Sequence, residues 1–543
     1  MPMLRTSSEA FPASKKVMSD IPYVLRVEFG DLAHEVSKII GKPIACQNCG
    51  GFLVSTDQIK EDDKVGKHFI CGFCSTLNLI EGEIVVAGEE TDFVVEPPPK
   101  DTETTTGEES PVGGSFLALI DVSGSMAGAN LAAVKRSLTN SIDSIAANAP
   151  DTLFGLIEFE SSVKCRNVES GKAIELPRAS FASLDDIESA TKKLLDDVKL
   201  VPVGDKSEQL KKHVNALRDQ GGTALGPAVA MASVITKHRN VARVVLLTDG
   251  LANEGIGALE GYQVTPADSF YQQVGERFKE FGAAVDVVGI ASGAGMELKA
   301  LGLMPEATGG QMYYVTPNEL DRSISELAGS RLLGRDVEVS IITPEGVTVK
   351  DASGVSRSVI DEILKEKKSK IGVVGENHEL YFEVEPDSKI DRSEIPIQVQ
   401  VAYTDEEGAR RIRSVTSHLN VTEEVDEIVK SLDPTIGATF VTQKAGEESF
   451  GGGNKGRERG ITRIENFRKA ISTRANQAPK PAQAKFKKAE QALAAEEEEM
   501  ERVQEMMKAA PEGAPSAAAD EAFTKGLAQM KRSSKQLFDE DEE

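Results

Sequence analysis

The chain has 543 residues, of which 40% are hydrophobic and 27% charged, and its formal net charge is −25. The length predicts about three or four domains of globular type. The acidic charge excludes nucleic acid as a partner, because binding a phosphate backbone requires a basic surface. No apolar run approaches the roughly 20 residues that span a bilayer, and the N-terminal stretch lacks the apolar core of a signal peptide. We therefore expect a cytoplasmic protein without a transmembrane segment, either free or peripherally associated with a membrane.

Four of the five cysteines lie in two Cys-x-x-Cys turns within residues 41–89. They are Cys46, Cys49, Cys71 and Cys74. Two such turns can close a tetrahedral Zn²⁺ site, and four thiolates leave no open position, so the pattern predicts a structural zinc ribbon. Two disulfides are the alternative, which the reducing environment of a chain without an export signal disfavours. His68 is near enough to compete as a ligand, but with four cysteines present we expect it to be a surface residue.

Residues 90–114 are rich in Pro, Thr and Glu and read as a semi-extended linker. From 115 to 333, apolar runs alternate with segments of helical periodicity, which predicts a mainly parallel, doubly wound, Rossmann-like sheet covered by helices on both faces. The expected strands are 116–120, 152–159, 243–248, 284–291 and 311–315. In such sheets the ligand site lies beyond the carboxyl ends of the strands.

Oxygen-bearing side chains gather at this edge of the expected sheet. DVSGSM follows the first strand with Asp121, Ser123 and Ser125, GGT brings Thr223 to the start of a helix, and TDG places Asp249 after the strand 243–248. If the two strands are neighbours, these residues converge on one point. Carboxylates and hydroxyls suit Mg²⁺ or Mn²⁺ and not a soft metal. Helix capping by Asp and Ser is the alternative explanation of DVSGS.

DVSGS, a distant GGT and a later LLTDG together resemble the metal-ion-dependent adhesion site of von Willebrand factor type A domains, over roughly residues 115–333. The resemblance implies that Asp121, Ser123 and Ser125 contact or orient the cation. It also implies that Thr223 supplies a hydroxyl in some states and that Asp249 holds the ion through water. A carboxylate from a partner protein would then complete the coordination shell.

The order of these segments resembles that in the inner-shell subunits of the COPII vesicle coat, and the ribbon sequence CGFCSTLN also resembles theirs. Short apolar runs over 335–422 predict an antiparallel β-sandwich, to which residues 22–30 of the N-terminal segment 1–40 can add a strand. Two features depart from that family. The roughly 120 residues after the sandwich are too few for its helical and gelsolin-like domains, and the metal motif is intact here whereas those subunits typically have a degraded one.

The segment 423–543 reads as a helical tail with hinges. GGGNKG at 451–456 predicts a hinge, and it lacks the Lys-Ser/Thr pair of a phosphate-binding loop. A second break is expected at 477–483. Seven-residue spacing then follows, at Phe486, Leu493, Met500 and Met507, with Glu496 as a polar residue at a core position. We expect this helix to dock within the chain, with self-association as the alternative.

The fold class is therefore a multidomain α/β protein, in which a type A domain is flanked by a zinc ribbon, a β-sandwich and a helical C-terminal region. No nucleophile elbow or zinc-protease motif occurs, so we expect no enzyme. The main hypothesis is an adaptor or scaffold that binds an acidic side chain of a partner protein through Mg²⁺. The first alternative is a COPII-like coat component in protein transport, with a small GTPase or coat proteins as partners. The second is a ubiquitin- or proteasome-associated factor.

Overall fold

The computed structural model divides the chain into two compact units. The β-rich unit comprises Met1–Lys100, Asp336–Arg502 and Gln529–Glu543, and the α/β unit comprises Asp101–Arg335 and Val503–Ala528. The structure describes residues 3–97 without 83, 114–249, 252–259, 266–291, 298–329, 332–405, 407–509, 522, 524–526, 528–529 and 537–538. None of the helices in these ranges is long and apolar enough to cross a membrane.

The α/β unit is built on one sheet whose centre is strand β9 (Ser115–Asp121). All seven residues of β9 are buried, as expected for a continuous apolar run covered on both faces. The sheet order is β12-β11-β10-β9-β14-β15-β16, with β13 pairing beside β10. The five strands from β10 to β16 are parallel, and β11, β12 and β13 are antiparallel additions. Their bounds are β10 Leu153–Phe159, β11 Val163–Arg166, β12 Ala173–Glu175, β13 Val201–Pro202, β14 Arg243–Thr248, β15 Ala284–Ile290 and β16 Met312–Val315.

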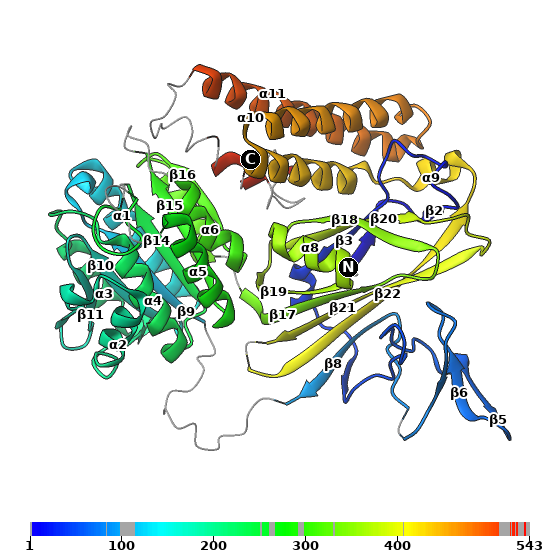
Figure 1. Ribbon diagram of the computed structural model, residues 1–543, viewed down its shortest axis with the longest axis horizontal. Coiled ribbons are helices and arrows are strands. Elements are labelled where there is room, and N and C mark those ends of the chain that lie inside the picture. Colours follow the sequence, from blue (N-terminus) through cyan, green and yellow to red (C-terminus); the bar gives the residue numbers. More distant parts are fainter. Residues whose placement is uncertain are drawn as a thin grey trace. The chain divides into compact units, whose positions relative to one another are not determined.

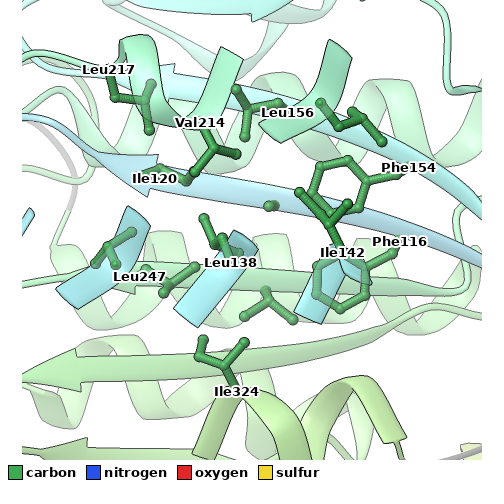
Figure 2. Close-up of a cluster of buried hydrophobic side chains, with 14 of the residues drawn as sticks. Phe116, Ile120, Leu138, Ile142, Phe154, Leu156, Val214, Leu217, Leu247 and Ile324 are labelled. Carbon is green, nitrogen blue, oxygen red and sulfur yellow. The ribbon is translucent and has the colours of Figure 1, made fainter. Parts of the chain in front are cut away.

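Helices cover both faces of this sheet (Figure 1). On one face, α1 (Ala129–Asn148), α3 (Val203–Ala216) and α7 (Leu320–Gly329) pack on the side chains of Phe116, Ala118 and Ile120. Figure 2 shows this core, in which Leu138 and Ile142 of α1 meet Phe116 and Phe154 of the sheet. The opposite face holds α2 (Leu184–Lys192), α4 (Leu225–Arg239), α5 (Ala267–Glu280) and α6 (Leu298–Thr308). The doubly wound α/β fold predicted from the sequence is therefore confirmed.

The β-rich unit contains two larger sheets. The first has the order β1-β3-β20-β18 and the second β19-β17-β21-β22-β8-β4, with β2 pairing beside β22. The expected N-terminal strand is present, because β3 pairs with β20 from Glu28↔Glu379 to Val24↔Glu383. The bounds are β1 Leu4–Thr6, β2 Ala10–Pro12, β3 Val24–Glu28, β4 Lys38–Ile40, β8 Glu90–Glu96, β17 Leu332–Ile342, β18 Val347–Ser353, β19 Lys368–Gly375, β20 Glu379–Pro386, β21 Glu394–Thr404 and β22 Arg410–Thr422. A helix, α8 (Arg357–Glu366), lies between β18 and β19.

The linker expected at 90–114 begins later than the sequence suggests. Glu90–Glu96 form β8, which pairs with β22 and β4, while 98–113 lie outside the described residues. Asp92 of β8 is fully buried and lies 3.3 Å from Arg411 and 3.6 Å from Arg413 of β22. In these ion pairs, two arginines of β22 compensate the buried charge of Asp92. The Pro/Thr/Glu-rich composition around β8 indicates a linker, so the strand is not recognisable from the sequence.

A small three-stranded sheet carries the cysteine turns. It has the order β5-β6-β7, with β5 at Ile59–Asp62, β6 at Gly66–Ile70 and β7 at Leu77–Leu79. Its inner side packs Phe69, Leu53 and Phe73 around the cysteines.

The tail forms α9 (Val425–Ser431), α10 (Pro434–Arg474) and α11 (Lys480–Ala509). Arg463 Nη2 bonds Glu448 Oε1 at 2.5 Å across a separation of fifteen residues, which in a straight helix would be about 22 Å apart. The chain therefore folds back on itself between these residues, around the glycine-rich segment 451–456.

The tail as far as Arg502 docks within the β-rich unit. Phe486, Leu493 and Met500 share a buried cluster with Val24 and Tyr381 of the β-sheets. Glu496, the polar residue at a core position, is buried and accepts a 2.8 Å hydrogen bond from Gln529. The expected docking within the chain is confirmed, although the side chain of Met507 lies outside the described part.

Candidate metal centres

The first candidate centre is formed by the four cysteines of the ribbon. Their sulfur atoms all lie within 4.8 Å of one another. Cys46 Sγ is 3.5 Å from Cys74 Sγ, and Cys49 Sγ is 3.5 Å from Cys71 Sγ. All four are free thiols, so the structure does not form the alternative pair of disulfides. The arrangement brings one pair of sulfurs from each turn to a single point, which is compatible with a structural Zn²⁺ ion.

The turns have the backbone conformations that such a centre needs. Gly50 follows the first Cys-x-x-Cys turn with φ +73, whereas in the second turn Ser75 takes this left-handed position at φ +58. The side chain of Asn78 donates to Cys46 Sγ at 3.4 Å, which is the kind of supporting contact that orients a metal ligand. His68 was expected at the surface but is buried, and its ring Nδ1 lies 2.9 Å from the Gly66 carbonyl oxygen.

The second candidate centre lies at the carboxyl edge of the parallel sheet. Strands β9 and β14 are adjacent and parallel, with Ile120 opposite Leu247. The chain leaves β9 at Asp121 and leaves β14 at Thr248, so Asp121 and Asp249 emerge side by side. A short 3₁₀ turn, Gly124–Met126, then carries the chain from β9 toward α1.

Short hydrogen bonds join the side chains at this edge. The Ser123 amide donates to Asp121 Oδ1 at 2.9 Å, and the Thr248 hydroxyl donates to Asp121 Oδ2 at 2.5 Å. The Ser125 hydroxyl donates to Asp249 Oδ1 at 2.8 Å and lies 3.0 Å from the Ser123 hydroxyl. Four of the five side chains that the sequence singled out are therefore in one bonded cluster, which we call the oxygen cluster.

Thr223 is placed differently. Its amide donates to Asn253 Oδ1 at 2.9 Å, and its carbonyl accepts from the amides of Asn253 and Glu254 at 3.1 and 3.2 Å. The same loop reaches the first motif through the Gly221 carbonyl, which accepts from the Gly124 amide at 3.1 Å. The hydroxyl of Thr223 makes no direct hydrogen bond to any of the other four side chains. Thr223 is thus buried beside the oxygen cluster without belonging to it.

Burial disfavours the ionised forms of the two aspartates in this cluster. It raises the pKa of Asp121 to about 6, with the neighbouring Asp249 charge adding to the rise, and it also raises the pKa of Asp249. Two buried carboxylates with serine hydroxyls between them are a hard donor set, and a divalent cation would offset their desolvation. The residues present therefore fit Mg²⁺ or Mn²⁺.

Sequence reasoning missed two side chains that support the cluster. Thr248 lies inside the quoted motif but was not assigned a role. Asn130, at the start of α1, donates to Asp249 Oδ2 at 2.7 Å. Nothing in the local pattern distinguishes Asn130, because its contact depends on where α1 begins relative to β14.

Residues 111–330 match the family model described as the Sec23/Sec24 trunk domain. The segment is therefore similar to a Sec23/Sec24 trunk domain. This match confirms the resemblance to the COPII inner-coat subunits that was inferred from the sequence. Human COPII-coat protein Sec24c has the same fold, with a TM-score of 0.70 and 16% identity over 98% of this chain and 76% of that chain.

Curated relatives extend beyond the trunk domain. Circularly permutated Ras protein 1 of Dictyostelium discoideum is 24% identical over 78% of this chain and 53% of its own length. Protein transport protein SEC24 of Kluyveromyces lactis is 21% identical over 75% of this chain and 46% of its own length. The chain thus spans about half the length of the curated relatives it matches.

Proposed function

We propose that this protein is a non-catalytic component of a COPII-like vesicle coat that works in protein transport. The observation that carries the proposal is the match of residues 111–330 to the trunk-domain model, in a chain of which 98% shares the fold of human Sec24c. Several relatives are named as protein transport proteins, which favours transport over the ubiquitin-associated alternative. The protein would act in the cytoplasm, peripherally associated with membranes, with other coat proteins, cargo and a small GTPase as partners.

We further propose a metal-dependent contact within this role. The oxygen cluster would hold Mg²⁺ or Mn²⁺ through Asp121, Ser123, Ser125 and Asp249, and Thr223 would join only if its loop shifts. The ion would supply an open coordination position for a carboxylate of a partner protein. Support comes from the mutually bonded donors, of which Asp121, Ser123 and Asp249 are buried, and from the raised pKa of both carboxyl groups.

The remaining domains would serve as a rigid frame. Zn²⁺ at the four cysteines would stabilise the ribbon of residues 41–89, because so small a module has little core of its own. Tail residues from Ile428 to Met500 share one buried core with strands β2, β3 and β20, so these parts would move as a single body.

Membrane recruitment tests the coat proposal. The tagged full chain, expressed in its own cells, should sediment in part with a membrane fraction and should be released by high salt without detergent. It should also be crosslinked there to another coat protein. A chain that stays wholly in the supernatant and is crosslinked to no coat protein would refute the proposal.

Asp121→Ala tests the metal contact separately. If the cluster binds a partner through the cation, this variant should lose one set of crosslinked partners, and EDTA should remove the same set from the wild type. Asp143→Ala is a matched control, since Asp143 is an exposed acid on α1 that pairs with Lys211. Partner recovery that is indifferent to both Asp121→Ala and EDTA would leave the coat proposal standing and remove the metal contact from it.

A further inference from the structure

The ribbon carries an unusual share of the exposed apolar surface. Among the described residues, all six large hydrophobic side chains that are strongly exposed lie between positions 40 and 84. They are Ile40, Val65, Ile70, Leu77, Leu79 and Ile84. Ile40 ends strand β4, and the other five lie in the ribbon of residues 41–89. Scattered exposed hydrophobics need no explanation, but five in one small module indicate an interaction surface.

Three of these side chains share one face of the three-stranded sheet. Ile70 of β6 is directly opposite Leu77 of β7, and Leu79 is two residues further along β7. Because side chains alternate along a strand, these three point to the same side, while Phe69 and Asn78 point into the ribbon core. Ile70, Leu77 and Leu79 are 50%, 49% and 52% exposed. We call this the outer face of the ribbon.

The backbone of β7 faces outward in the same place. The Cys71 amide bonds the Thr76 carbonyl and the Ile80 amide bonds the Lys67 carbonyl, both at 2.9 Å. Hydrogen-bonded pairs alternate along an antiparallel ladder, so Ile70↔Leu77 and His68↔Leu79 are the non-bonded pairs between them. The N–H and C=O groups of Leu77 and Leu79 therefore point away from β6.

The side of β7 that faces away from β6 is an open sheet edge. In the described part of the chain, β7 ends the order β5-β6-β7 and no strand pairs with its other side. Proteins usually protect such edges with charged residues or proline. Here the edge combines two outward-facing leucines with two sets of unpaired backbone groups, which is the combination that strand addition uses: main-chain bonds for affinity and alternate side chains for specificity.

We propose that β7 is a docking site for an extended segment of a partner protein that adds as a fourth strand. The segment would carry aliphatic residues at alternate positions, which would pack on Leu77, Leu79 and Ile70. A second copy of this chain is a poorer occupant, since two three-residue strands would bury far less than the roughly 1,200 Å² of a stable interface. The site is independent of the oxygen cluster and of the coat proposal.

A labelled peptide tests this site. The probe is a short, soluble peptide in which leucine and threonine alternate, and its binding to the zinc-loaded full chain is measured by fluorescence anisotropy. We expect saturable binding to the wild type, and binding about tenfold weaker or more to the double variant Leu77→Thr, Leu79→Thr. Threonine favours strands, so the double variant should keep its zinc and its fold.

Two controls separate strand addition from general stickiness. Val65→Thr removes an apolar side chain at the hairpin between β5 and β6, and it should bind the peptide like the wild type. The same peptide with N-methylated amides keeps its leucines but cannot form the ladder, and it should not bind the wild type. This second control needs no protein variant, so the test holds even if the double variant misfolds.

Several results would overturn the proposal. These are equal binding of the N-methylated peptide, equal binding by a zinc-loaded double variant, or no binding by the wild type up to about 1 mM peptide. Concentration-dependent dimerisation of the wild type that the double variant lacks would overturn it in favour of a second copy.

Discussion

Replacing Asp121 by asparagine should stabilise the metal-free protein and abolish its response to Mg²⁺. The side chain is fully buried, and its pKa rises from 3.8 to about 6. This rise corresponds to about 3 kcal/mol, which the ionised carboxylate costs the folded state near neutral pH. Asparagine has the same shape but can accept only one of the two hydrogen bonds from Ser123 and Thr248, which costs about 1 kcal/mol. The net gain in EDTA is about 2 kcal/mol.

The sign of the pH dependence follows from the direction of the pKa change. Because the folded-state pKa of Asp121 lies above the unfolded value, protonation favours the folded state. The metal-free wild type should therefore gain stability relative to Asp121→Asn as the pH falls from about 7 toward 4, and the advantage of the variant should be gone below about 4.

Calorimetry of both proteins checks this reasoning. In EDTA near pH 7.5, the melting transition of the α/β unit should be about 4–8 °C higher in Asp121→Asn than in the wild type. Mg²⁺ at about 100 times its Kd should add about 2.7 kcal/mol to the wild type and nothing to the variant. A variant that is less stable than the wild type in EDTA would refute the buried-charge argument, and a variant that responds to Mg²⁺ like the wild type would refute the assignment of the metal site.

Further predictions concern the zinc ribbon, the hydrophobic core of the α/β unit and a buried ion pair in the β-rich unit. Changing both Cys46 and Cys71 to serine should remove the bound zinc and unfold the ribbon, as elemental analysis and proteolysis would show; a zinc-free wild type with an unchanged melting profile would contradict this. Leu138→Ala in α1 should lower the free energy of unfolding of the α/β unit by about 2–5 kcal/mol in urea, and a loss below about 1 kcal/mol would mean that the site collapses around the cavity. Lys444, 3% exposed, pairs with Asp351 and Glu447, so Lys444→Ala and Lys444→Met both remove the cation that these acids face, and each should cost about 3 kcal/mol; a clearly smaller cost for Lys444→Met would show that lost packing dominates over the lost charge.

Local patterns in the sequence are sufficient to predict the parallel sheet and both candidate centres. Buried parallel strands are continuous apolar runs, so β9 and β14 are recognisable from their residues alone. The edge at which Asp121 and Asp249 meet follows from that topology, because parallel strands end on the same side. The cysteine turns are likewise local, since each pair of thiols is set by four consecutive residues.

Pairings between distant segments could not be predicted in the same way. Nothing local marks Glu90–Glu96 as a strand, and its burial depends on Arg411 and Arg413, more than 300 residues later. The glycines at 451–456 predict the fold-back of α10, but the sequence does not predict which side chains then meet, such as Arg463 and Glu448.

The sequence by itself determined the residue types, the strand ends and the spacing of the ligands, because these depend on neighbours within a few positions. Only the tertiary structure decided which side chains touch: Thr248 and Asn130 join the oxygen cluster, Thr223 stays outside it, and the backbone of β7 faces an open edge. The physical reason is that a contact depends on the rotation and register of elements packed against each other, which the whole core sets together.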